Sequence, residues 1–545
     1  MAEVGVFTLE SLVNGMYPSS LDTFREYIQN SCDAIDKARA DKILAEDGGT
    51  VEITIDKDAR RITIEDDGTG ISVLDFKSTL TNIGYSDKSL ETDRGFRGIG
   101  RLCGLAYCRE LRFVSTARGE GIQSTVIFDA AKLSKLFQEN FYTKKKYTVK
   151  EALDEIVSFD TVVADNDEHF FRVELIDIVG TNNSLLDIEK VRDYLSFVAP
   201  VTYSPHLYYQ ELIYKHAKEL GFKITEYRIL VNGEPVVKNY KTNVRTYKDK
   251  DEIFGVDFHD FRNDEEKLIA WSWVGLSEIK GVLSEDRSSP DYKMRGVRLR
   301  AGNIQIGNQE VFKNLFKEGR GMKYFIGEVH AVDKNLIPNA RRDYLEENPA
   351  YKTLEAALIG YFAELNKIYR TASKIRSRYS EINKPAETER EFQRGHSKKF
   401  KNRAELDAEL VKLNKAADSA KKKISELQQK AEQEPDSAWS RVVLRMIKNH
   451  SDNNPPPPVN LRSRLRKQVN SPHQLGEEKS ATFTLKSVAS FSTTRNSRVE
   501  SSSTRLTRCS PNEPPRPVNR TQLQEQIHSR QLDEARDVFS AGVQR

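Results

Sequence analysis

The segment FREYIQNSCDAIDK, residues 24–37, predicts an amphipathic helix with one strongly polar face. Glu26, Asn30 and Asp33 stand at positions i, i+4 and i+7, so a helix places them on a single face. Apolar side chains recur between them at helical spacing, which predicts that the opposite face packs on a sheet. A carboxylate on such a face can orient a water, and an amide oxygen can bind a magnesium ion. The alternative is a solvated polar stripe.

The next motif is a predicted β-hairpin that ends in an aspartate and two glycines. Residues 51–56 (VEITID) and 61–65 (RITIE) alternate apolar and polar side chains around a KDAR turn. The second strand runs directly into Asp66, and Gly68 and Gly70 follow it. Such an aspartate can turn its carboxylate toward a planar ligand, while the glycines let that ligand lie against backbone. The pattern alone also occurs in ordinary turns, so its neighbours matter.

Two glycine-rich stretches come next, TNIGYSDKS at residues 81–89 and GFRGIGR at residues 95–101. The second precedes LCGLAYC, an apolar stretch that we expect to be helical. Backbone N–H groups of such a turn and the positive end of a helix dipole both suit a polyphosphate. The spacing is neither that of a Walker loop nor that of a Rossmann fingerprint.

In this order the motifs resemble those of the GHKL ATPases, the family that contains gyrase B, the ninety-kilodalton heat-shock chaperones, MutL and sensor kinases. The resemblance is strongest to the heat shock protein 90 family, over about residues 5–375, because YPSSLDTFREYIQNSCDAIDKAR looks like that family's first long helix and its lead-in. The phrase GFRGIGRL instead resembles the lid of MutL, MORC and bacterial heat-shock-like ATPases. The resemblance implies an α+β protein whose first domain is a Bergerat fold, a two-layer α/β sandwich that binds ATP and Mg²⁺.

Residue by residue, the resemblance makes Glu26 the general base that polarises the attacking water, and Asn30 the ligand of Mg²⁺. Asp66 would accept a hydrogen bond from the adenine amino group, with Gly70 beneath the base. Asp33 would line the pocket near the adenine and the sugar. The other expected ATP-binding residues form the far wall and the lid: Gly68, Asn82, Gly84, Ser86, Lys88, Gly95, Phe96, Arg97, Gly98, Ile99, Gly100 and Arg101.

The sequence departs from the family pattern at one place beside the adenine. Many relatives carry a Gly-Thr pair on a later strand, and the strand aligned with it, HFFRVELIDI at residues 169–178, lacks that pair. Thr125, in GIQSTVIFD, is a substitute candidate.

A second domain is expected after residues 186–204, which resemble the helix that closes the chaperone nucleotide domain. We therefore expect an ATP-binding domain over residues 1–210 and a mixed α/β middle domain over residues 211–383. Residues 228–237 (RILVNGEPVV) predict a hairpin around an Asn-Gly turn. Further alternating strands are predicted at residues 268–276, 295–306 and 324–332.

The segment LIPNARRD, residues 336–343, resembles the chaperone loop whose N-x-x-R arginine reaches the γ-phosphate. Asn339 and Arg342 fit that phrase, and Arg341 is the neighbouring alternative. A guanidinium suits the role because it is always charged and can donate two parallel bonds to phosphate oxygens. The alternative is a solvated turn before a helix near Pro349.

Three other arginines alternate along one predicted strand: Arg295, Arg298 and Arg300. We expect them to form a solvent face or a client-facing surface.

The carboxy-terminal third is expected to be helical and then disordered. Residues 351–383 predict a long helix, and residues 384–435 a helical coiled-coil segment ended by Pro435. Its a/d seam is Leu406, Leu410, Leu413, Ala417, Ala420, Ile424, Leu427 and Ala431. The seam can pair with itself in a homodimer through residues 406–431, which we favour because an unpaired seam leaves apolar surface wet, or it can pack back on the same chain.

Residues 451–545 predict a disordered basic tail, with a possible short helix near residues 521–540. The tail holds 15 Lys and Arg against 9 Asp and Glu, so the first 450 residues carry about −2 of the net charge of +4. The body is therefore not a basic nucleic-acid platform, while the tail could touch acidic partners. No apolar run suits a membrane span or a signal peptide, so we expect no membrane contact and a cytoplasmic location. The four cysteines lack disulfide or zinc spacing.

Together these patterns predict an ATPase that converts ATP to ADP and phosphate and acts as a conformational switch resembling a heat shock protein 90-type chaperone. One alternative is a MutL- or MORC-like nucleic-acid clamp in genome maintenance or defence. Another is a scaffold that binds ATP without hydrolysing it. Phosphotransfer of the sensor-kinase type is not expected, since it needs a phosphoacceptor histidine on a helix ahead of the ATP domain, and only 25 residues precede Glu26.

Overall fold

A computed structural model describes residues 4–15, 19–84, 98–143, 145–180, 183–246, 249–395 and 399–453. The expected tail at residues 451–545 and its possible helix near residues 521–540 lie almost entirely outside this part of the chain. Within it, no helix combines the length and the apolar character needed to cross a membrane. Its three cysteines, Cys32, Cys103 and Cys108, are buried free thiols.

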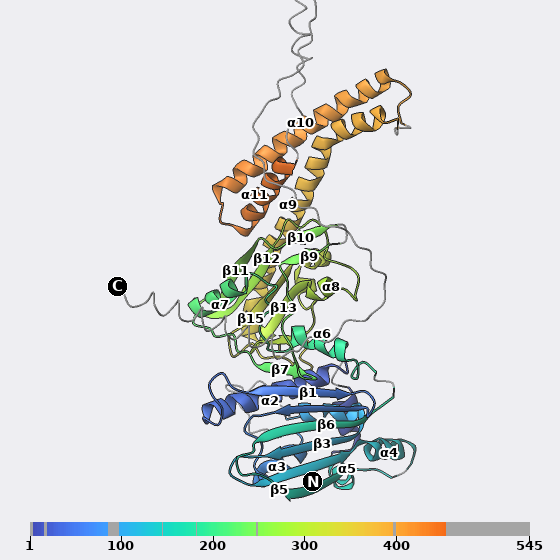
Figure 1. The fold of residues 1–545 in the computed structure, drawn as a ribbon, viewed down its shortest axis with the longest axis vertical. Helices are drawn as coiled ribbons and strands as arrows, with labels where there is room; N and C mark the ends of the chain where they lie inside the picture. The colour runs from blue at the N-terminus through green and yellow to red at the C-terminus, as the bar shows by residue number, and fades with distance from the viewer. Residues whose placement is uncertain are drawn as a thin grey trace, which may run out of the picture. The chain divides into compact units, whose positions relative to one another are not determined.

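The first structural layer is an eight-stranded sheet with strand order β5-β4-β3-β6-β2-β1-β7-β8 (Figure 1). Alternate residues of β1 and β2 are buried and the others are more exposed, which shows that helices cover one face. This is the two-layer α/β sandwich that the sequence predicts. Its strands are β1 Thr50–Asp56, β2 Arg61–Asp66, β3 Cys108–Thr116, β4 Ile122–Asp129, β5 Val157–Val163, β6 Phe170–Ile178, β7 Arg228–Val231 and β8 Glu234–Pro235.

The helices that cover this sheet bury apolar stripes, which form one continuous core with the strands. Helix α2 uses Phe24, Ile28 and Ile35, which are at most 1% exposed, and it packs on β1 and β2. The predicted amphipathic helix at residues 24–37 is thus confirmed. The helices are α1 Phe7–Asn14, α2 Asp22–Ala40, α3 Val73–Thr81, α4 Ala130–Tyr142, α5 Val149–Ile156 and α6 Ile188–Val198, with a 3-10 helix at Gly100–Ala106.

Both predicted hairpins are present, but the second belongs to the first sheet. Strands β1 and β2 pair antiparallel, as expected. Strands β7 and β8 also pair antiparallel around the Asn-Gly turn, yet β7 lies parallel to β1, with Val51 opposite Ile229. The hairpin at residues 228–237 therefore extends the first sheet rather than opening the middle domain.

The second sheet has five strands in the order β11-β12-β15-β13-β14 and is covered on both faces. The interior strand β12 is buried at nearly every residue, because both faces of the sheet are covered. The strands are β11 Gly255–Arg262, β12 Leu268–Leu276, β13 Gly296–Ala301, β14 Ile304–Ile306 and β15 Ile326–Ala331. A small ribbon, two short helices and two 3-10 turns complete this part: β9 Asn243–Arg245, β10 Lys250–Glu252, α7 Gln210–Glu219, α8 Pro290–Met294, Lys313–Leu315 and Gly319–Tyr324.

The expectation of a solvent-facing arginine strand is wrong. Arg295, Arg298 and Arg300 on and beside β13 are 4%, 2% and 0% exposed. They are buried because the polar groups of neighbouring segments supply their hydrogen bonds, Arg298 to Gln305 and Arg300 to Glu328.

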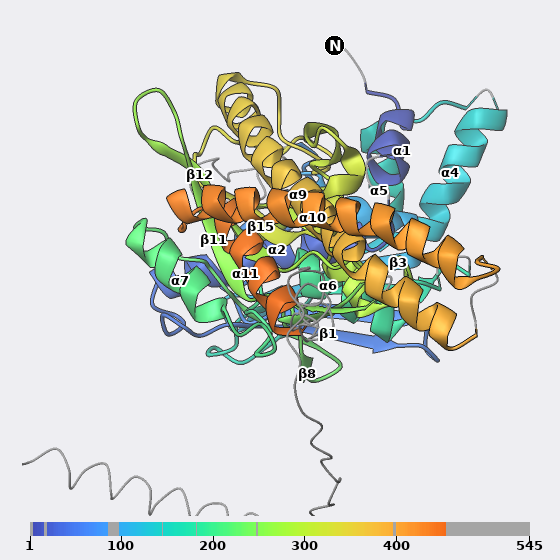
Figure 2. The ribbon, with the colours of Figure 1, turned by 90° about the horizontal axis from the view of Figure 1, so that it is seen from above.

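Three helices follow the second sheet and pack on one another (Figure 2). They are α9 Pro349–Gln393, α10 Arg403–Gln433 and α11 Ala438–Asn453. Helix α9 continues through the expected boundary at residue 383, and α10 ends just before Pro435 as predicted.

The coiled-coil seam is used inside the chain. Leu406, Ala417, Ala420, Ile424 and Ala431 are buried, and α10 packs on α9 and α11. The seam thus packs back on the same chain, which is the second of the two expected arrangements, and the favoured homodimer through residues 406–431 stays a prediction.

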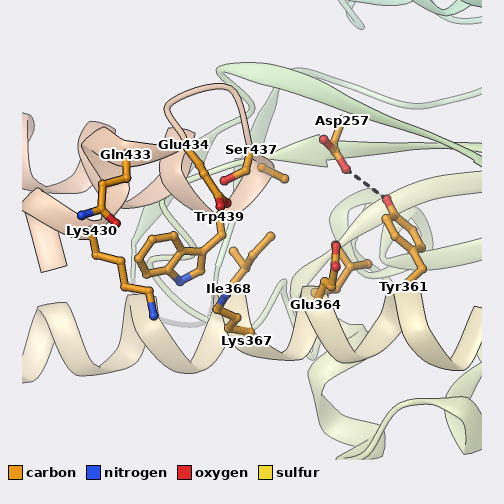
Figure 3. Close-up of a pocket in the computed structure, with 12 residues that line it drawn as sticks. Asp257, Tyr361, Glu364, Lys367, Ile368, Lys430, Gln433, Glu434, Ser437 and Trp439 are labelled. Atoms are coloured by element: carbon orange, nitrogen blue, oxygen red, sulfur yellow. Dashed lines mark hydrogen bonds between the residues drawn. The ribbon is translucent and has the colours of Figure 1, made fainter.

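A small cavity of about 170 Å³ lies where α9, α11 and the end of α10 meet β11 (Figure 3). Tyr361 donates a hydrogen bond to Asp257 at 3.4 Å, and Arg441 contacts the other carboxylate oxygen at 2.8 Å. Trp439 extends from α11 toward α9, where its indole N–H donates to Thr371. These contacts fasten α9 and α11 to the second sheet and to each other.

Candidate functional site

A cavity of about 840 Å³ lies over the polar face of α2. Glu26, Asn30 and Asp33 all line it, as their helical spacing predicts. Glu26 and Asp33 are 8% and 7% exposed, so the face is enclosed rather than a solvated stripe.

Asp66, the last residue of β2, lines the cavity. Its side chain is 1% exposed, and its Oδ1 accepts a hydrogen bond from the Gly68 N–H at 3.1 Å. Burial raises the pKa of Asp66 to about 7, and hydrogen bonds from Ser31 and Gly68 only partly offset it. Asp66 thus gives the cavity lining a poorly solvated carboxyl group.

Gly70 stands where any side chain would collide with the sheet. Its φ is +64°, and an added Cβ would lie 1.9 Å from the Thr116 carbonyl oxygen. The neighbouring Ile71 N–H donates to Ser115 Oγ at 2.9 Å, and Ser115 donates to the Phe170 carbonyl at 2.8 Å. The backbone here therefore lies flat against β3, which leaves the cavity side open.

The glycine-rich segment also lines this cavity, through Gly98, Ile99, Gly100 and Arg101. Gly98 has a φ of +66°, and the 3-10 helix begins at Gly100. The Tyr27 hydroxyl of α2 donates to the Arg101 carbonyl at 3.0 Å and accepts from the Gly104 N–H at 3.1 Å. Helix α2 thus holds the start of this glycine-rich segment in place.

Arg101 also ties this segment to the end of α3. Its guanidinium donates to the Asn82 carbonyl, and burial lowers the pKa of Arg101 to about 10. Gly84 donates from its N–H to the Gly98 carbonyl at 3.5 Å. Five expected lid residues lie outside the described residues: Ser86, Lys88, Gly95, Phe96 and Arg97.

Arg342 enters the cavity from the loop that follows β15. It is 7% exposed and has a φ of +53°, a backbone conformation that the loop must enforce. The Gly307 N–H donates to the Arg342 carbonyl at 2.8 Å, and the Arg342 N–H donates to the Asn339 carbonyl at 3.0 Å. Its Nε lies 3.4 Å from Glu26 Oε1. The neighbouring Arg341 is exposed and does not line the cavity.

The comparisons with known proteins match this part of the chain. A family model described as histidine kinase-, DNA gyrase B- and HSP90-like ATPase matches residues 20–161. Residues 20–161 are a domain of this ATPase family. Over 380 residues the chain is also 22% identical to the chaperone protein HtpG of Citrobacter koseri. The matched region covers 64% of this chain and 54% of that protein. The chain thus spans about half the length of this curated relative.

The structure brings most of the expected site of the ATPase domain together. The residues that line the one cavity are Glu26, Asn30, Asp33, Asp66, Gly70, Gly98, Ile99, Gly100, Arg101 and Arg342. Gly68, Asn82 and Gly84 do not line it, but each bonds a residue that does.

Thr125 does not lie at the expected place. It is on β4, which β3 and β6 separate from Asp66 on β2. Three strand spacings amount to about 14 Å, too far for both residues to contact one adenine. The residue opposite Asp66 is Phe171 of β6, and Phe171 lines the cavity and stacks on Phe113.

Sequence reasoning missed Arg25, which is 4% exposed beside the site. Its guanidinium lies 3.4 Å from both Glu26 and Asp22, and it donates to the Arg341 carbonyl at 3.5 Å. The sequence did hold one signal: Arg25 is next to Glu26 in α2. A buried cation needs anionic or carbonyl partners, and Glu26 is one of them.

Proposed function

We propose that this protein binds ATP with Mg²⁺, hydrolyses it to ADP and phosphate, and uses the cycle as a conformational switch. The observation that carries the proposal is that Glu26 of α2, Asp66 of β2 and Arg342 of a distant loop line one cavity. Its volume of about 840 Å³ falls within the range of nucleotide-sized pockets.

Asp66 and Gly70 suit the adenine end. A carboxylate in a poorly solvated position is a strong acceptor for the adenine amino group. Gly70 lets the turn lie against the sheet, where a Cβ would meet the Thr116 carbonyl oxygen, and the ring would lie on the backbone from the cavity side. Asp33 lies on the same α2 face as Glu26 and Asn30 and would contact the adenine or the sugar.

The other end of α2 suits the phosphates. Asn30 would supply an oxygen ligand to Mg²⁺, whose charge would offset that of the phosphates. Glu26 would orient the attacking water and accept its proton. Gly98 and Gly100 would present backbone N–H groups to the phosphates beneath the lid.

Arg342 would contribute the charge that stabilises phosphoryl transfer. A guanidinium has five N–H donors in a rigid fork. Arg342 can therefore keep its Nε toward Glu26 while its two Nη groups bind γ-phosphate oxygens. Because Arg342 lies more than 300 residues from Glu26 in the sequence, ATP bound between them would hold two distant segments together.

We propose a chaperone-like output acting on protein clients, supported by the identity with HtpG, a protein named as a chaperone. The test uses Glu26→Ala, which should bind ATP without completing hydrolysis and so retain its partner. We expect a pull-down with this variant and ATP to recover unfolded model protein, and Asp66→Asn, which should not bind ATP, to recover none. Recovery of nucleic acid instead, with a salt-dependent gel shift lost on deleting residues 451–545, would favour a clamp. Recovery that is equal with and without ATP would contradict a switch.

A further inference from the structure

A fully buried charged cluster lies in the second sheet, away from the ATP cavity. We call it the Glu328 cluster; its members are Glu328 of β15, Arg300 of β13, Lys238 and Tyr240 of the segment after β8, and Tyr203 of the loop between α6 and α7. Glu328, Arg300 and Lys238 are each 0% exposed. Charged side chains are almost never buried to this degree unless they are paired, so their partners define the geometry of the region.

Both carboxylate oxygens of Glu328 are saturated with donors. Oε1 accepts from Arg300 Nε and from the Tyr240 hydroxyl at 3.0 Å. Oε2 accepts from the Tyr203 hydroxyl at 2.6 Å and lies 3.4 Å from Lys238 Nζ. Trp273 Nε1 donates to the same oxygen at 3.3 Å, and His330 Nε2 lies 3.2 Å from it. A network satisfied in this way fixes one arrangement of its members.

The charges of the cluster also favour a single fixed arrangement of its members. Burial acts to raise the pKa of Glu328, but Arg300 and Lys238 hold it well below its usual range. Burial and the nearby Arg300 lower the pKa of Lys238 to about 7. The carboxylate is therefore the ionised centre on which the surrounding donors depend.

The cluster reaches the ATPase domain through Arg300. Arg300 Nη2 donates to the Phe197 carbonyl, in the last turn of α6, at 2.8 Å. The same helix carries Tyr194, whose hydroxyl donates to Asp22 Oδ1 at 2.7 Å. Asp22 begins α2 and pairs with Arg25, which contacts Glu26. Helix α6 thus connects the cluster, bonded at Phe197, to the helix that carries Glu26, bonded at Tyr194.

The cluster also lies on the strand that leads to Arg342. Glu328 is in the middle of β15, and the loop with Arg342 leaves the end of that strand. The first loop residue, Val332, donates to the Ile269 carbonyl of β12 at 2.9 Å, and Leu336 is buried. The start of the loop is therefore held against β12. The position of Arg342 in the cavity then depends on the orientation of β15.

We propose that Glu328 is a positioning residue of the ATPase, which through Arg300 locks β15 to α6 and so places Arg342 against Glu26. The inference rests on the proposed ATP hydrolysis. Glu328 does not line the nucleotide cavity, so it would act on hydrolysis by fixing where Arg342 meets Glu26.

The test compares Arg300→Lys and Glu328→Gln with the wild type in full-length protein. Arg300→Lys keeps the charge beside Glu328 but cannot also reach the Phe197 carbonyl. We expect kcat to fall by roughly tenfold or more, since small misplacements of a catalytic group are costly, while the Kd for ATP stays within about twofold. Arg441→Lys is the matched control, because Arg441 also bonds a carboxylate and a carbonyl, Asp257 and Val256, but links α11 to β11. Its kcat should not change.

The decisive measurement is the kcat of Arg300→Lys combined with Arg342→Ala, compared with the kcat of Arg342→Ala alone. If Glu328 and Arg300 act through Arg342, Arg300→Lys will cause no further fall in kcat there. An equal fall in both backgrounds, or an unchanged kcat for Arg300→Lys and Glu328→Gln, would overturn the inference. If Glu328→Gln does not fold, Tyr203→Phe, which removes one donor to Glu328, replaces it. A wild type without ATP hydrolysis would instead overturn the proposed function, so the two failures are distinguishable.

Discussion

Arg342 Nε lies 3.4 Å from Glu26 Oε1, and both side chains are about one-tenth exposed. The contact joins α2 of the ATPase domain to the loop after β15, within the cavity that holds Asp66. Opposite charges that meet in a shielded pocket attract more strongly than on the surface. The relationship places a candidate base and a candidate phosphate-binding cation side by side.

Replacing Arg342 by Ala should lower kcat for ATP hydrolysis by roughly 100-fold, because the transition state loses its guanidinium. Arg341→Ala is the control: its side chain is exposed and outside the cavity lining, so its kcat should stay within about twofold. Steady-state phosphate release measures both. A larger loss for Arg341→Ala than for Arg342→Ala would reverse the assignment.

Adenosine binding should weaken as the pH falls below 7. Burial raises the pKa of Asp66 to about 7, and the amino group of adenine needs the ionised carboxylate as acceptor. Binding then competes with protonation, so the Kd should be roughly tenfold higher at pH 6 than at pH 8. Calorimetry with adenosine, which has no phosphate to titrate, measures it. A Kd independent of pH would contradict competition between adenosine and a proton for the Asp66 carboxylate.

The same pKa shift predicts how stability depends on pH. Because the folded-state pKa of Asp66 is raised above its unfolded value, folding favours the protonated form. The contribution of Asp66 to stability is therefore lost as the pH rises from about 4 to about 7. Asp66→Asn should remove this dependence, which denaturant titrations of the two proteins at pH 5 and pH 8 would show.

Gly70→Ala should destabilise the protein by about 2 kcal/mol or more, because the new Cβ meets the Thr116 carbonyl oxygen at 1.9 Å in addition to a positive φ. Gly119→Ala is a matched control, since Gly119 has a φ of +87° but no atom within 4 Å of an added Cβ. It should cost about 1 kcal/mol from backbone strain alone. Denaturant titration of each variant compares the two, and equal losses would contradict a steric role for Gly70.

Ile424→Ala should loosen the packing of α10 on α9. Ile424 is 7% exposed, and truncating a buried isoleucine costs about 2–4 kcal/mol. Val411→Ala on the same helix is the control, because Val411 is 71% exposed. Hydrogen exchange of the α10 amides should accelerate in the first variant and not in the second. Unchanged exchange in Ile424→Ala would mean that the seam is not packed within the chain.

The sequence was sufficient where neighbouring residues determine the structure. The helix with Glu26, the hairpin that ends at Asp66 and the antiparallel pair around Asn232-Gly233 follow from local periodicity and turn chemistry. The convergence of Glu26, Asp66 and Arg342 followed from a family resemblance rather than from periodicity.

Long-range pairing was not predictable. Arg300 looked solvent-facing because its partner Glu328 lies on a strand that is not sequential with its own. The α10 seam predicts an apolar partner but not which one, since a helix of the same chain and a second copy offer the same chemistry. Strand β7 joins β1 across about 170 residues of sequence, and no turn signal carries that information.

The most direct test of the central claim is steady-state phosphate release by the wild type and by Glu26→Ala, with ATP binding measured in parallel. We predict that the wild type releases phosphate and that Glu26→Ala binds ATP with similar affinity but hydrolyses it at least about 100-fold more slowly. Equal rates in the two proteins, or no release by the wild type, would contradict the account.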